Sequence, residues 1–545
     1  MSVSRLFESY PPYKALFLVV VLTTVYLFRQ WYNRSKNGKL PPGPRGLPLV
    51  GNTFQIGRLP WFQLTKWAKQ YGPIYSLNLG NQLLVVLNNH KVATDLLDKR
   101  STIYSDRPRS IMTGELLCGG FFFAFNSTND LWKRLRRSAY EGLNFRSADV
   151  FQPVQEREAV RLADALIKDP ANWMDHINRV TASSVLSICY SLPPMASATD
   201  PVITRINAFM SRIESAARPG EYLVEIFPWM LRLPKCMCKW RRDAEEAHRK
   251  DTNMFMEFHM DAKRRAASGN CGPCMSGILM QRDDVSDKEA AWLAGTLFGA
   301  GATTTAAAQH VFILAMVLYP EAMRKAQAEI DAVVGRSRLP DFSDRDKLPY
   351  VRAIIREIFR WRNIGPLGLP HYSNEDDYYE GYYIPKGTMI YFNQWAMNFD
   401  PEAYGDDLDE FRPERFLDET LKKEKLPPNT HGEGHTGFGY GRRKCIGVNI
   451  AKSTLFINIA TTLWAFDLSK AKDEFGNEIT PDKNAFEDRG LVVGPDPFPV
   501  VFTPRYPDVV AEITEHAHQV VKPVPVQPTP LAKAELDAGY DQVNL

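Results

Sequence analysis

The feature that most constrains this chain is a long stretch without charge in its second half. No Asp, Glu, Lys or Arg occurs from Ala291 to Tyr319, and Ser286 with Glu289 forms a capping-box pattern just before it, so we predict one long helix. A stretch of this length could cross a membrane or form the centre of a large globular domain. The composition of its middle favours the second interpretation.

The middle of this stretch consists largely of small side chains, and some of them are polar. It contains three glycines and three consecutive threonines, followed by an amide and an imidazole side chain: Gly295, Gly299, Gly301, Thr303, Thr304, Thr305, Gln309 and His310. Small side chains let a flat partner approach the backbone closely, as in a buried central helix that borders a ligand site. A buried core helix without any ligand is the alternative at this point.

Length and composition indicate a large globular protein without a strongly charged partner. The chain has 545 residues, and its 66 Lys and Arg nearly balance its 63 Asp and Glu, which gives no reason to expect nucleic acid as a partner. Seven cysteines at low density are typical of a reducing compartment. The sequence from Cys271 to Cys274 resembles a redox or zinc motif, but no strand pattern precedes it, so we interpret it as a plain surface loop.

The amino terminus carries a targeting signal, which we predict to be an uncleaved membrane anchor within residues 1–40. Residues 15–28 hold no charge, aromatic residues flank them, and a basic cluster follows, formed by Arg29, Arg34, Lys36 and Lys39. A cleavable signal peptide is the alternative, but no small-residue cleavage site follows the apolar run. The basic cluster predicts that the globular part lies in the cytoplasm.

A proline-rich connector and a polar tail bound one domain. Four prolines between Leu40 and Pro48 predict an extended, stiff spacer. From residue 41 to residue 505 no comparable break or repeat occurs, so we predict a single domain that is mainly α-helical with small β-sheets, the β-like stretches being Pro73–Val86 and Gly381–Asn393. The tail, residues 506–545, is rich in Val, Pro and charge, and we predict that it is disordered.

The strongest local signal surrounds Cys445. Phe438, Gly441, Arg443, Cys445 and Gly447 mark a short segment that leads into a long apolar helix. Free backbone N–H groups at a helix start stabilise a thiolate, which is the form that binds iron, and glycines let the backbone approach a flat macrocycle. A lone cysteine would be interpreted as a small buried hydrophobic residue, but the whole segment predicts a metal ligand.

This segment resembles the cysteine loop of the cytochrome P450 superfamily, whose pattern F-x-x-G-x-R-x-C-x-G is matched at every fixed position. The resemblance extends over roughly residues 41–505, because further signatures follow in the order that the family has. It implies the cytochrome P450 fold and a haem b cofactor with the thiolate of Cys445 as axial iron ligand. The sequence is also similar to fungal microsomal members of secondary metabolism.

The same resemblance implies that Glu357, Arg360 and Arg415 form a buried ion triad that supports the cysteine loop. Glu357 and Arg360 lie three residues apart in a helical stretch and so share one helix face. Arg415 belongs to a segment that looks like the P-E-R-F motif of the family. An exposed helical Glu/Arg pair is the alternative for this spacing taken alone.

A haem carries two propionates, which call for Arg, Trp and His donors in a partly buried site. Trp132 and Arg136 match the W-x-x-x-R helix of the family, and Arg443 precedes the cysteine by two residues as the loop motif requires. Arg107 and His371 occupy positions where members of the family use further propionate ligands. A solvated arginine and an ordinary loop histidine are the alternatives for these two.

On the oxygen side, the segment Ala300–Thr305 resembles the central-helix motif of the family, in which an acidic residue precedes a threonine. By this resemblance Gly301 makes room for dioxygen, and Thr304 holds the water that supplies protons. Thr303 stands where the family usually has the acid. The proton relay must therefore run through hydroxyls and water, or through another acid that the sequence does not identify.

The resemblance implies a monooxygenase that oxidises a hydrophobic small molecule with dioxygen, the thiolate promoting cleavage of the O–O bond. No G-x-G-x-x-G motif follows a strand, so electrons from NADPH must arrive through a separate protein. That donor would be the membrane-bound NADPH–cytochrome P450 reductase, with cytochrome b5 as a further candidate. The expected location is the endoplasmic reticulum membrane, with the catalytic domain on its cytoplasmic face.

The segments at the pocket positions of the family are apolar, so we expect an apolar substrate. From them we predict these pocket residues: Phe121, Phe122, Phe298, Ala302, Ile364, Leu367 and Leu491. Similarity to fungal members favours a terpenoid, a polyketide-derived aromatic or an indole as substrate, and the sequence does not choose among them.

Three other functions stay open on the sequence alone. A haem-thiolate isomerase or dehydratase on the same fold would need no reductase and would consume no NADPH. A haem-binding sensor or carrier would need no threonine cluster in the central helix. A membrane scaffold would bind no haem at all.

Overall fold

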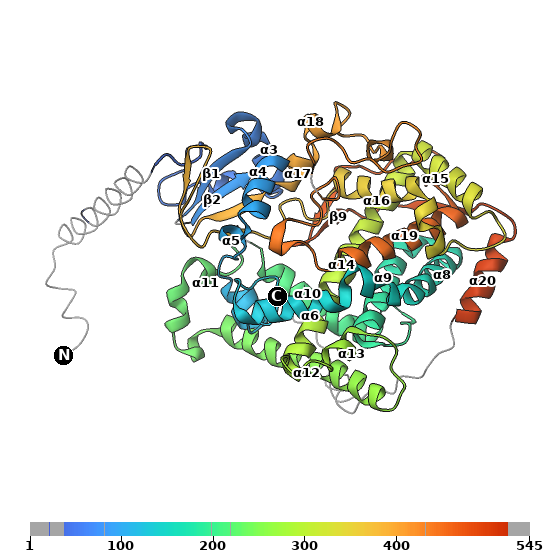
Figure 1. Cartoon of the computed structure of the whole chain (residues 1–545), viewed down its shortest axis with the longest axis horizontal. Helices are drawn as coiled ribbons and strands as arrows, with labels where there is room; N and C mark the ends of the chain where they lie inside the picture. The colour runs from blue at the N-terminus through green and yellow to red at the C-terminus, as the bar shows by residue number, and fades with distance from the viewer. Residues whose placement is uncertain are drawn as a thin grey trace.

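The computed structural model describes residues 38–520 together with Val21, apart from Asn81, Ala198, Pro219 and His431. Within this range the chain is mainly helical with small sheets, as predicted (Figure 1). The predicted anchor with most of its basic cluster, and the tail beyond residue 520, lie outside the described residues.

Helix α14 (Asp287–Leu318) runs through the middle of the helical part of the molecule (Figure 1). The capping box is formed: Ser286 Oγ accepts a hydrogen bond from the N–H of Glu289, and the Glu289 carboxylate accepts one from the N–H of Ser286. Within the described residues this is the one helix long and apolar enough to cross a membrane, and 78% of its most apolar window is buried by protein. The prediction of a buried central helix is therefore confirmed.

Five long helices pack on or close to α14: α8 (Gln152–Lys168), α9 (Trp173–Tyr190), α12 (Lys239–Ala267), α16 (Pro349–Trp361) and α19 (Val448–Ala465). The glycines of α14 make part of this packing possible. A Cβ atom at Gly295 would collide with Phe255 of α12, and one at Gly299 would collide with Met210 of α10 (Pro201–Ala216). Gly295 therefore serves helix packing, and Gly299 serves helix packing and also borders the cavity described below.

The remaining α-helices are shorter or lie toward the periphery. They are α3 (Pro60–Tyr71), α4 (His90–Ala93), α5 (Ser101–Tyr104), α6 (Asp130–Leu143), α7 (Phe145–Ala148), α11 (Leu223–Ile226), α13 (Met275–Leu279), α15 (Pro320–Val333), α17 (Gln394–Asn398) and α18 (Pro401–Tyr404). Short 3-10 or π turns join several of them.

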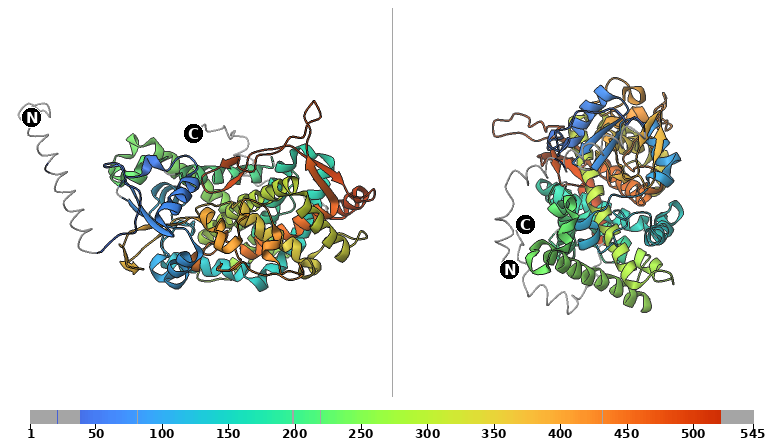
Figure 2. Two further views of the ribbon diagram at one scale, coloured as in Figure 1. Left: turned by 90° about the horizontal axis from the view of Figure 1, so that it is seen from above. Right: turned by 90° about the vertical axis from the view of Figure 1, so that its left-hand side faces the viewer.

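The largest sheet joins segments that are far apart in the chain, and Figure 2 shows it to one side of the helices. Its order is β1 (Ile74–Leu79), β2 (Gln82–Leu87), β6 (Met389–Phe392) and β3 (His371–Tyr372), and β2 pairs with β6 in parallel. The predicted β-like stretches therefore pair with each other. Three two-stranded sheets complete the β structure: β4 (Asp377–Tyr379) with β5 (Tyr382–Ile384), β7 (Phe466–Lys470) with β10 (Val500–Pro504), and β8 (Phe486–Asp488) with β9 (Val493–Pro495).

The proline-rich connector is part of the domain rather than a free spacer. The N–H and the hydroxyl of Ser76 in β1 donate to the carbonyls of Pro42 and Pro41, each at 2.7 Å. The carbonyl of Lys39 accepts from the N–H of Tyr383 in β5 at 2.9 Å. Because proline leaves its own carbonyl free to accept, an extended proline segment can dock on strands without forming a regular ladder.

The prediction of disorder from residue 506 onward is wrong for the first part of the tail. Residues Val509–Val520 form helix α20, which packs on α8. Val509, Ile513 and Ala517 are buried, and their spacing of four residues places them on one face of the helix. The composition of the whole tail hid this short amphipathic segment.

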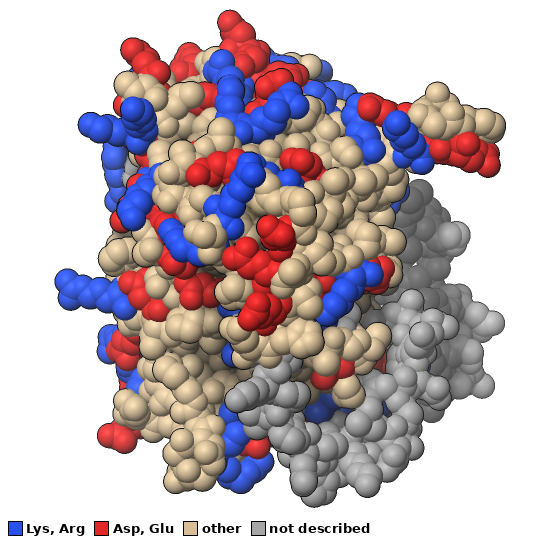
Figure 3. Space-filling model, turned by 90° about the vertical axis from the view of Figure 1, so that its right-hand side faces the viewer, with Lys and Arg blue, Asp and Glu red and all other residues tan. Residues whose placement is uncertain are grey.

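On the face in Figure 3, acidic and basic side chains are interspersed.

Candidate functional site

The structure brings the two strongest sequence signals to one internal cavity of about 360 Å³. Gly301, Thr303 and Thr304 of α14 border it, and so do residues of the cysteine loop and several other predicted ligands: Arg107, Arg136, His371, Phe438, Arg443, Cys445 and Gly447. The lining is mostly apolar. A cavity of this size and character is typical of a binding site for a small organic molecule or cofactor.

The cysteine loop holds Cys445 at the edge of this cavity. The N–H of Cys445 donates to the carbonyl of Phe438 at 2.8 Å, and α19 begins three residues later at Val448. Gly441 has a φ of +55°, and a Cβ atom there would collide with the carbonyl of Leu97, so the turn requires glycine. The thiol is exposed where the loop borders this cavity.

Two opposing effects act on the Cys445 thiol. Burial raises its pKa, while the N–H of Gly447 and the positive charges of Arg136 and Lys444 lower it. The backbone amide and the two cations favour the thiolate, which is the form that binds a metal. This agrees with the electrostatic argument made from the sequence.

Three arginines lie close together beside the loop without a carboxylate partner in the described part of the chain. Each uses its guanidinium on backbone carbonyls: Arg107 on Ala124, Leu369 and Pro370, Arg136 on Lys444, and Arg443 on Ser105, Phe123 and Asn126. Burial, followed by the charge of its neighbours, lowers the pKa of Arg107 well below its usual value and that of Arg443 to about 9. One buried and two half-buried cations without an anion call for a negatively charged ligand.

Trp132 adds a further donor to this set, and His371 borders the same cavity. The indole N–H of Trp132 is buried and has no hydrogen-bond partner in the described part of the chain, and the guanidinium carbon of Arg443 lies 4.4 Å from the centre of its ring. The Nδ1 atom of His371 lies 2.6 Å from the carbonyl oxygen of Tyr104, and burial lowers the pKa of this histidine well below its usual range. A sulfur ligand, an orphaned N–H donor and unpaired arginines fit a flat macrocycle that carries two carboxylates.

The hydroxyls of Thr303 and Thr304 each donate a hydrogen bond to a carbonyl of their own helix. Thr304 Oγ1 donates to the carbonyl of Ala300 at 2.7 Å, and Thr303 Oγ1 donates to that of Gly299 at 3.4 Å. Each hydroxyl keeps lone pairs that can accept from water. Gly301 also brings α14 close to α9, since a Cβ atom there would lie 3.3 Å from a methyl carbon of Val185.

Thr303 borders a second, smaller cavity, which offers an acid that the sequence did not identify. This cavity is lined by His310, Glu487 and Arg489 among others. Burial lowers the pKa of His310 to about 3, so it is neutral near pH 7. Glu487 is paired with Arg489 at 2.7 Å, and it is the one acidic residue among the described residues that line this smaller cavity.

Only part of the predicted substrate pocket lines the cavity. Phe122, Ile364 and Leu491 border it. The other four predicted residues, Phe121, Phe298, Ala302 and Leu367, do not.

These four residues lie away from the cavity for geometric reasons. Phe298 and Ala302 each lie two residues, about 200°, from the cavity-lining Ala300 on α14, so they face the opposite side and are buried in the core. Phe121 stacks on Trp292, with ring centres 5.9 Å apart. Leu367 packs against apolar residues on the sheet side of the domain.

The cavity also has residues that the sequence analysis missed, and five of them come from α9 and α10. They are Val185, Ile188, Cys189, Met210 and Glu214. Both helices are ordinary amphipathic helices, so their periodicity marks buried residues without distinguishing the core from a cavity wall. Among the residues of this group, Glu214 alone carries an ionisable carboxyl.

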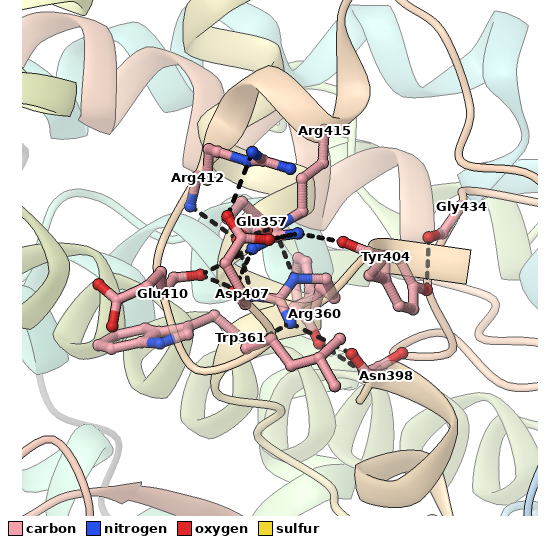
Figure 4. Close-up of polar contacts among 12 residues, drawn as sticks. Glu357, Arg360, Trp361, Asn398, Tyr404, Asp407, Glu410, Arg412, Arg415 and Gly434 are labelled. Carbon is pink, nitrogen blue, oxygen red and sulfur yellow. Dashed lines mark hydrogen bonds and ion pairs between the residues drawn. The ribbon is translucent and has the colours of Figure 1, made fainter. Parts of the chain in front are cut away.

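Glu357, Arg360 and Arg415 meet in a buried cluster (Figure 4). The carboxylate of Glu357 forms a bidentate ion pair with the guanidinium of Arg360 at 2.6 and 2.7 Å, and both side chains are 0% exposed. Arg415 Nε lies 3.4 Å from Glu357 Oε1. The alternative of an exposed helical pair is therefore excluded by burial.

The cysteine pair that resembles a redox or zinc motif lies just before α13. Cys271 and Cys274 have their sulfurs 3.7 Å apart, but within the described residues no group of three His, Cys, Asp or Glu side chains could hold a metal ion. Cys274 is buried at the start of α13 and accepts from the N–H of Gly277, so the interpretation as a plain surface loop is wrong for this residue.

Comparison with known proteins identifies the family. The family model for cytochrome P450 matches residues 41–502. Cytochrome P450 monooxygenase 58 of Postia placenta is 49% identical over 91% of this chain and 94% of that protein, and monooxygenase 253 of the same fungus is 48% identical over the same shares. Cytochrome P450 monooxygenase iboC of Amanita muscaria is 35% identical over 88% of this chain and 94% of that protein.

These matches cover the connector, the sheets, the central helix and the cysteine loop, and the relatives named above are fungal monooxygenases. The family implies a haem-thiolate cofactor and a redox partner. The chain belongs to the cytochrome P450 family and is a cytochrome P450 monooxygenase.

Proposed function

We propose that this monooxygenase oxidises a hydrophobic small molecule, typically by hydroxylation, with haem b held by the thiolate of Cys445. The observation that carries this proposal is the single cavity bordered by Cys445, by Thr304 and by buried and half-buried arginines that lack a carboxylate partner in the described chain. When bound, the haem supplies the activation of dioxygen.

The residues around the cavity have different roles in holding the haem and the substrate. Arg107, Arg136 and Arg443, with the indole N–H of Trp132, are suited to hold the two propionates by charge-assisted hydrogen bonds. The Nδ1–H of neutral His371 donates to the carbonyl of Tyr104, so its other ring nitrogen can only accept a hydrogen bond. The apolar walls exclude water from the reacting carbon.

Electrons are proposed to come from NADPH–cytochrome P450 reductase, with cytochrome b5 as a further donor. Lys133 and Arg137 of α6 and Arg442 of the cysteine loop are exposed, and the bond from Arg136 to the carbonyl of Lys444 at 2.6 Å holds α6 against the loop. Lys133, Arg137 and Arg442 form a basic area on the side of the cavity where Cys445 lies. Such an area would attract an acidic partner protein. Arg134 does not belong to this area, because its guanidinium pairs with Glu289.

We further propose an endoplasmic reticulum location with residues 1–40 as anchor and the catalytic domain in the cytoplasm. The support within the described chain is an exposed apolar group in α11 and the turn that follows it, formed by Leu223, Ile226, Phe227 and Trp229. Apolar side chains clustered at a surface favour contact with lipid. Sedimentation of the full chain with lipid vesicles tests this, and a chain that stays in the supernatant would contradict it.

The proposed substrates are terpenoids, polyketide-derived aromatics or indoles of fungal secondary metabolism. The apolar cavity supports a carbon-rich substrate, and the fungal relatives support the biological setting. The test is turnover of the full chain with reductase, NADPH and a panel of such compounds. We expect a reduced carbon-monoxide spectrum typical of thiolate ligation, and one labelled oxygen atom from ¹⁸O₂ in the product for each NADPH used productively. Product formed without NADPH would instead indicate an isomerase or dehydratase.

Changing Thr304 to alanine is expected to uncouple the reaction. Without the hydroxyl that positions water on the oxygen side, protons arrive late, so product per NADPH should fall roughly tenfold or more while hydrogen peroxide rises. Thr303→Val is the matched control on the neighbouring residue, and we expect a smaller effect from it. Wild-type coupling in Thr304→Ala would mean that protons come by another route, such as the smaller cavity beside Glu487.

A further inference from the structure

One wall of the cavity carries a buried carboxyl group that the haem site does not use. Glu214 lies in the last turn of α10 and borders the same cavity as Cys445. Its side chain is over nine-tenths buried, and Oε1 accepts no hydrogen bond from the described part of the chain. An acceptor left unsatisfied in an apolar site is costly, so its presence beside a ligand cavity calls for a donor on the ligand.

The charged groups around Glu214 form their hydrogen bonds and ion pairs with other residues. Arg489 pairs with Glu487 at 2.7 Å, and Arg218 donates to the carbonyl of Asp488 at 3.3 Å. Both arginines influence Glu214 through their charge, and Glu487 opposes them, but burial is the dominant effect and raises the pKa of Glu214 to about 7. Near neutral pH the carboxyl is therefore easily switched to its charged, strongly accepting form by a donor that enters the cavity.

Glu214 is the one carboxyl group among the described residues that line the cavity. The remaining contributions to the cavity wall from α9 and α10 are Val185, Ile188, Cys189 and Met210, which are apolar or weakly polar. The arginines beside the cysteine loop are donors, and they are matched by the haem propionates. Glu214 is thus placed to recognise a part of the substrate that differs from the carbon to be oxidised.

We propose that Glu214 determines substrate specificity by accepting a hydrogen bond from a hydroxyl or N–H group on an otherwise apolar substrate. This inference rests on the proposed function of the same cavity and narrows its substrate class. Pure hydrocarbons and fully methylated analogues are then poor ligands, since they leave the carboxyl buried and unpaired.

Matched pairs of probes test this, each pair differing only in the donor. The pairs are farnesol and its methyl ether, 2-naphthol and its methyl ether, and indole and N-methylindole. Binding to the purified haem-loaded full chain is measured by calorimetry without reductase, so that no turnover occurs. We expect the donor to bind about tenfold more tightly than its methylated partner in at least one pair, and that pair identifies the terpenoid, aromatic or indole class.

Variants at Glu214 assign the preference to this residue. In Glu214→Leu the ratio of the two affinities should fall to within about twofold, because the acceptor is gone while a similar volume remains. In Glu214→Gln it should be intermediate, since the amide oxygen accepts without charge. Glu221→Gln, at an exposed position near the end of α10, is the control and should keep the wild-type ratio.

Two outcomes would overturn the inference: no preference in any pair for the wild-type chain, or an unchanged preference in Glu214→Leu. Failure of the proposed function is recognised separately. It would appear as a chain that contains no thiolate-ligated haem in its reduced carbon-monoxide spectrum, which is recorded for every preparation before the calorimetry.

Discussion

Cys445→Ser is expected to remove both the thiolate-type absorbance and all monooxygenase activity. Serine keeps the size of the side chain, but a neutral hydroxyl is a poor iron ligand and supplies no comparable electron density. The reduced carbon-monoxide spectrum and product formation with reductase measure the two effects. Activity should fall below detection, which is the largest change we expect from any single substitution in this chain.

The fold itself should survive this change. The loop is held by the hydrogen bond from the N–H of Cys445 to the carbonyl of Phe438 and by the turn at Gly441, neither of which involves the sulfur. Circular dichroism of Cys445→Ser should therefore match the wild type. Cys236→Ser changes an exposed thiol and is the control for general effects of cysteine replacement. Retained oxygenase activity in Cys445→Ser would contradict the assignment of the haem ligand.

The parts of the site that the sequence could predict are those fixed by local chemistry. A cysteine loop needs glycine at its turn, and Gly441 shows why, because any side chain there would collide with the carbonyl of Leu97. The central helix needs its cap and its uncharged run, both of which are visible in the residues themselves. Such requirements depend on neighbours in the sequence or on one rigid contact.

The parts of the site that the sequence could not predict depend on how helices are rotated against each other. Phe298 and Ala302 were expected in the pocket from their place in the central helix, but about 200° of helix rotation separates each of them from Ala300. Glu214 was missed for the same reason, since the pattern of α10 indicates a buried face without showing that part of this face borders a cavity. The docking of Pro41 and Pro42 on β1 is likewise a long-range contact.

Glu357→Gln is expected to destabilise the domain strongly. The change removes the charge that compensates Arg360 in a place where neither side chain is exposed, and breaking such a buried pair costs about 3–5 kcal/mol. The midpoint of urea unfolding, followed by tryptophan fluorescence, measures the loss. The chain supplies a matched control in Glu321 and Arg324 of α15, which have the same spacing but are largely exposed. Glu321→Gln should leave the midpoint of urea unfolding almost unchanged, because an exposed ion pair contributes little to stability.

The effect of Glu357→Gln should reach the haem as well as the fold. Arg360 donates to the carbonyls of Asn398, Leu408 and Glu410, so the pair fixes a long segment of backbone (Figure 4). The side-chain oxygen of Asn398 accepts from the N–H of Thr436, two residues before Phe438. A displaced Arg360 would loosen this connection to the cysteine loop. We therefore expect haem to be lost from Glu357→Gln at urea concentrations below its unfolding midpoint, whereas in Glu321→Gln both losses should coincide as in the wild type. If haem loss and unfolding coincided in Glu357→Gln as they do in Glu321→Gln, the triad would have a role in general stability alone.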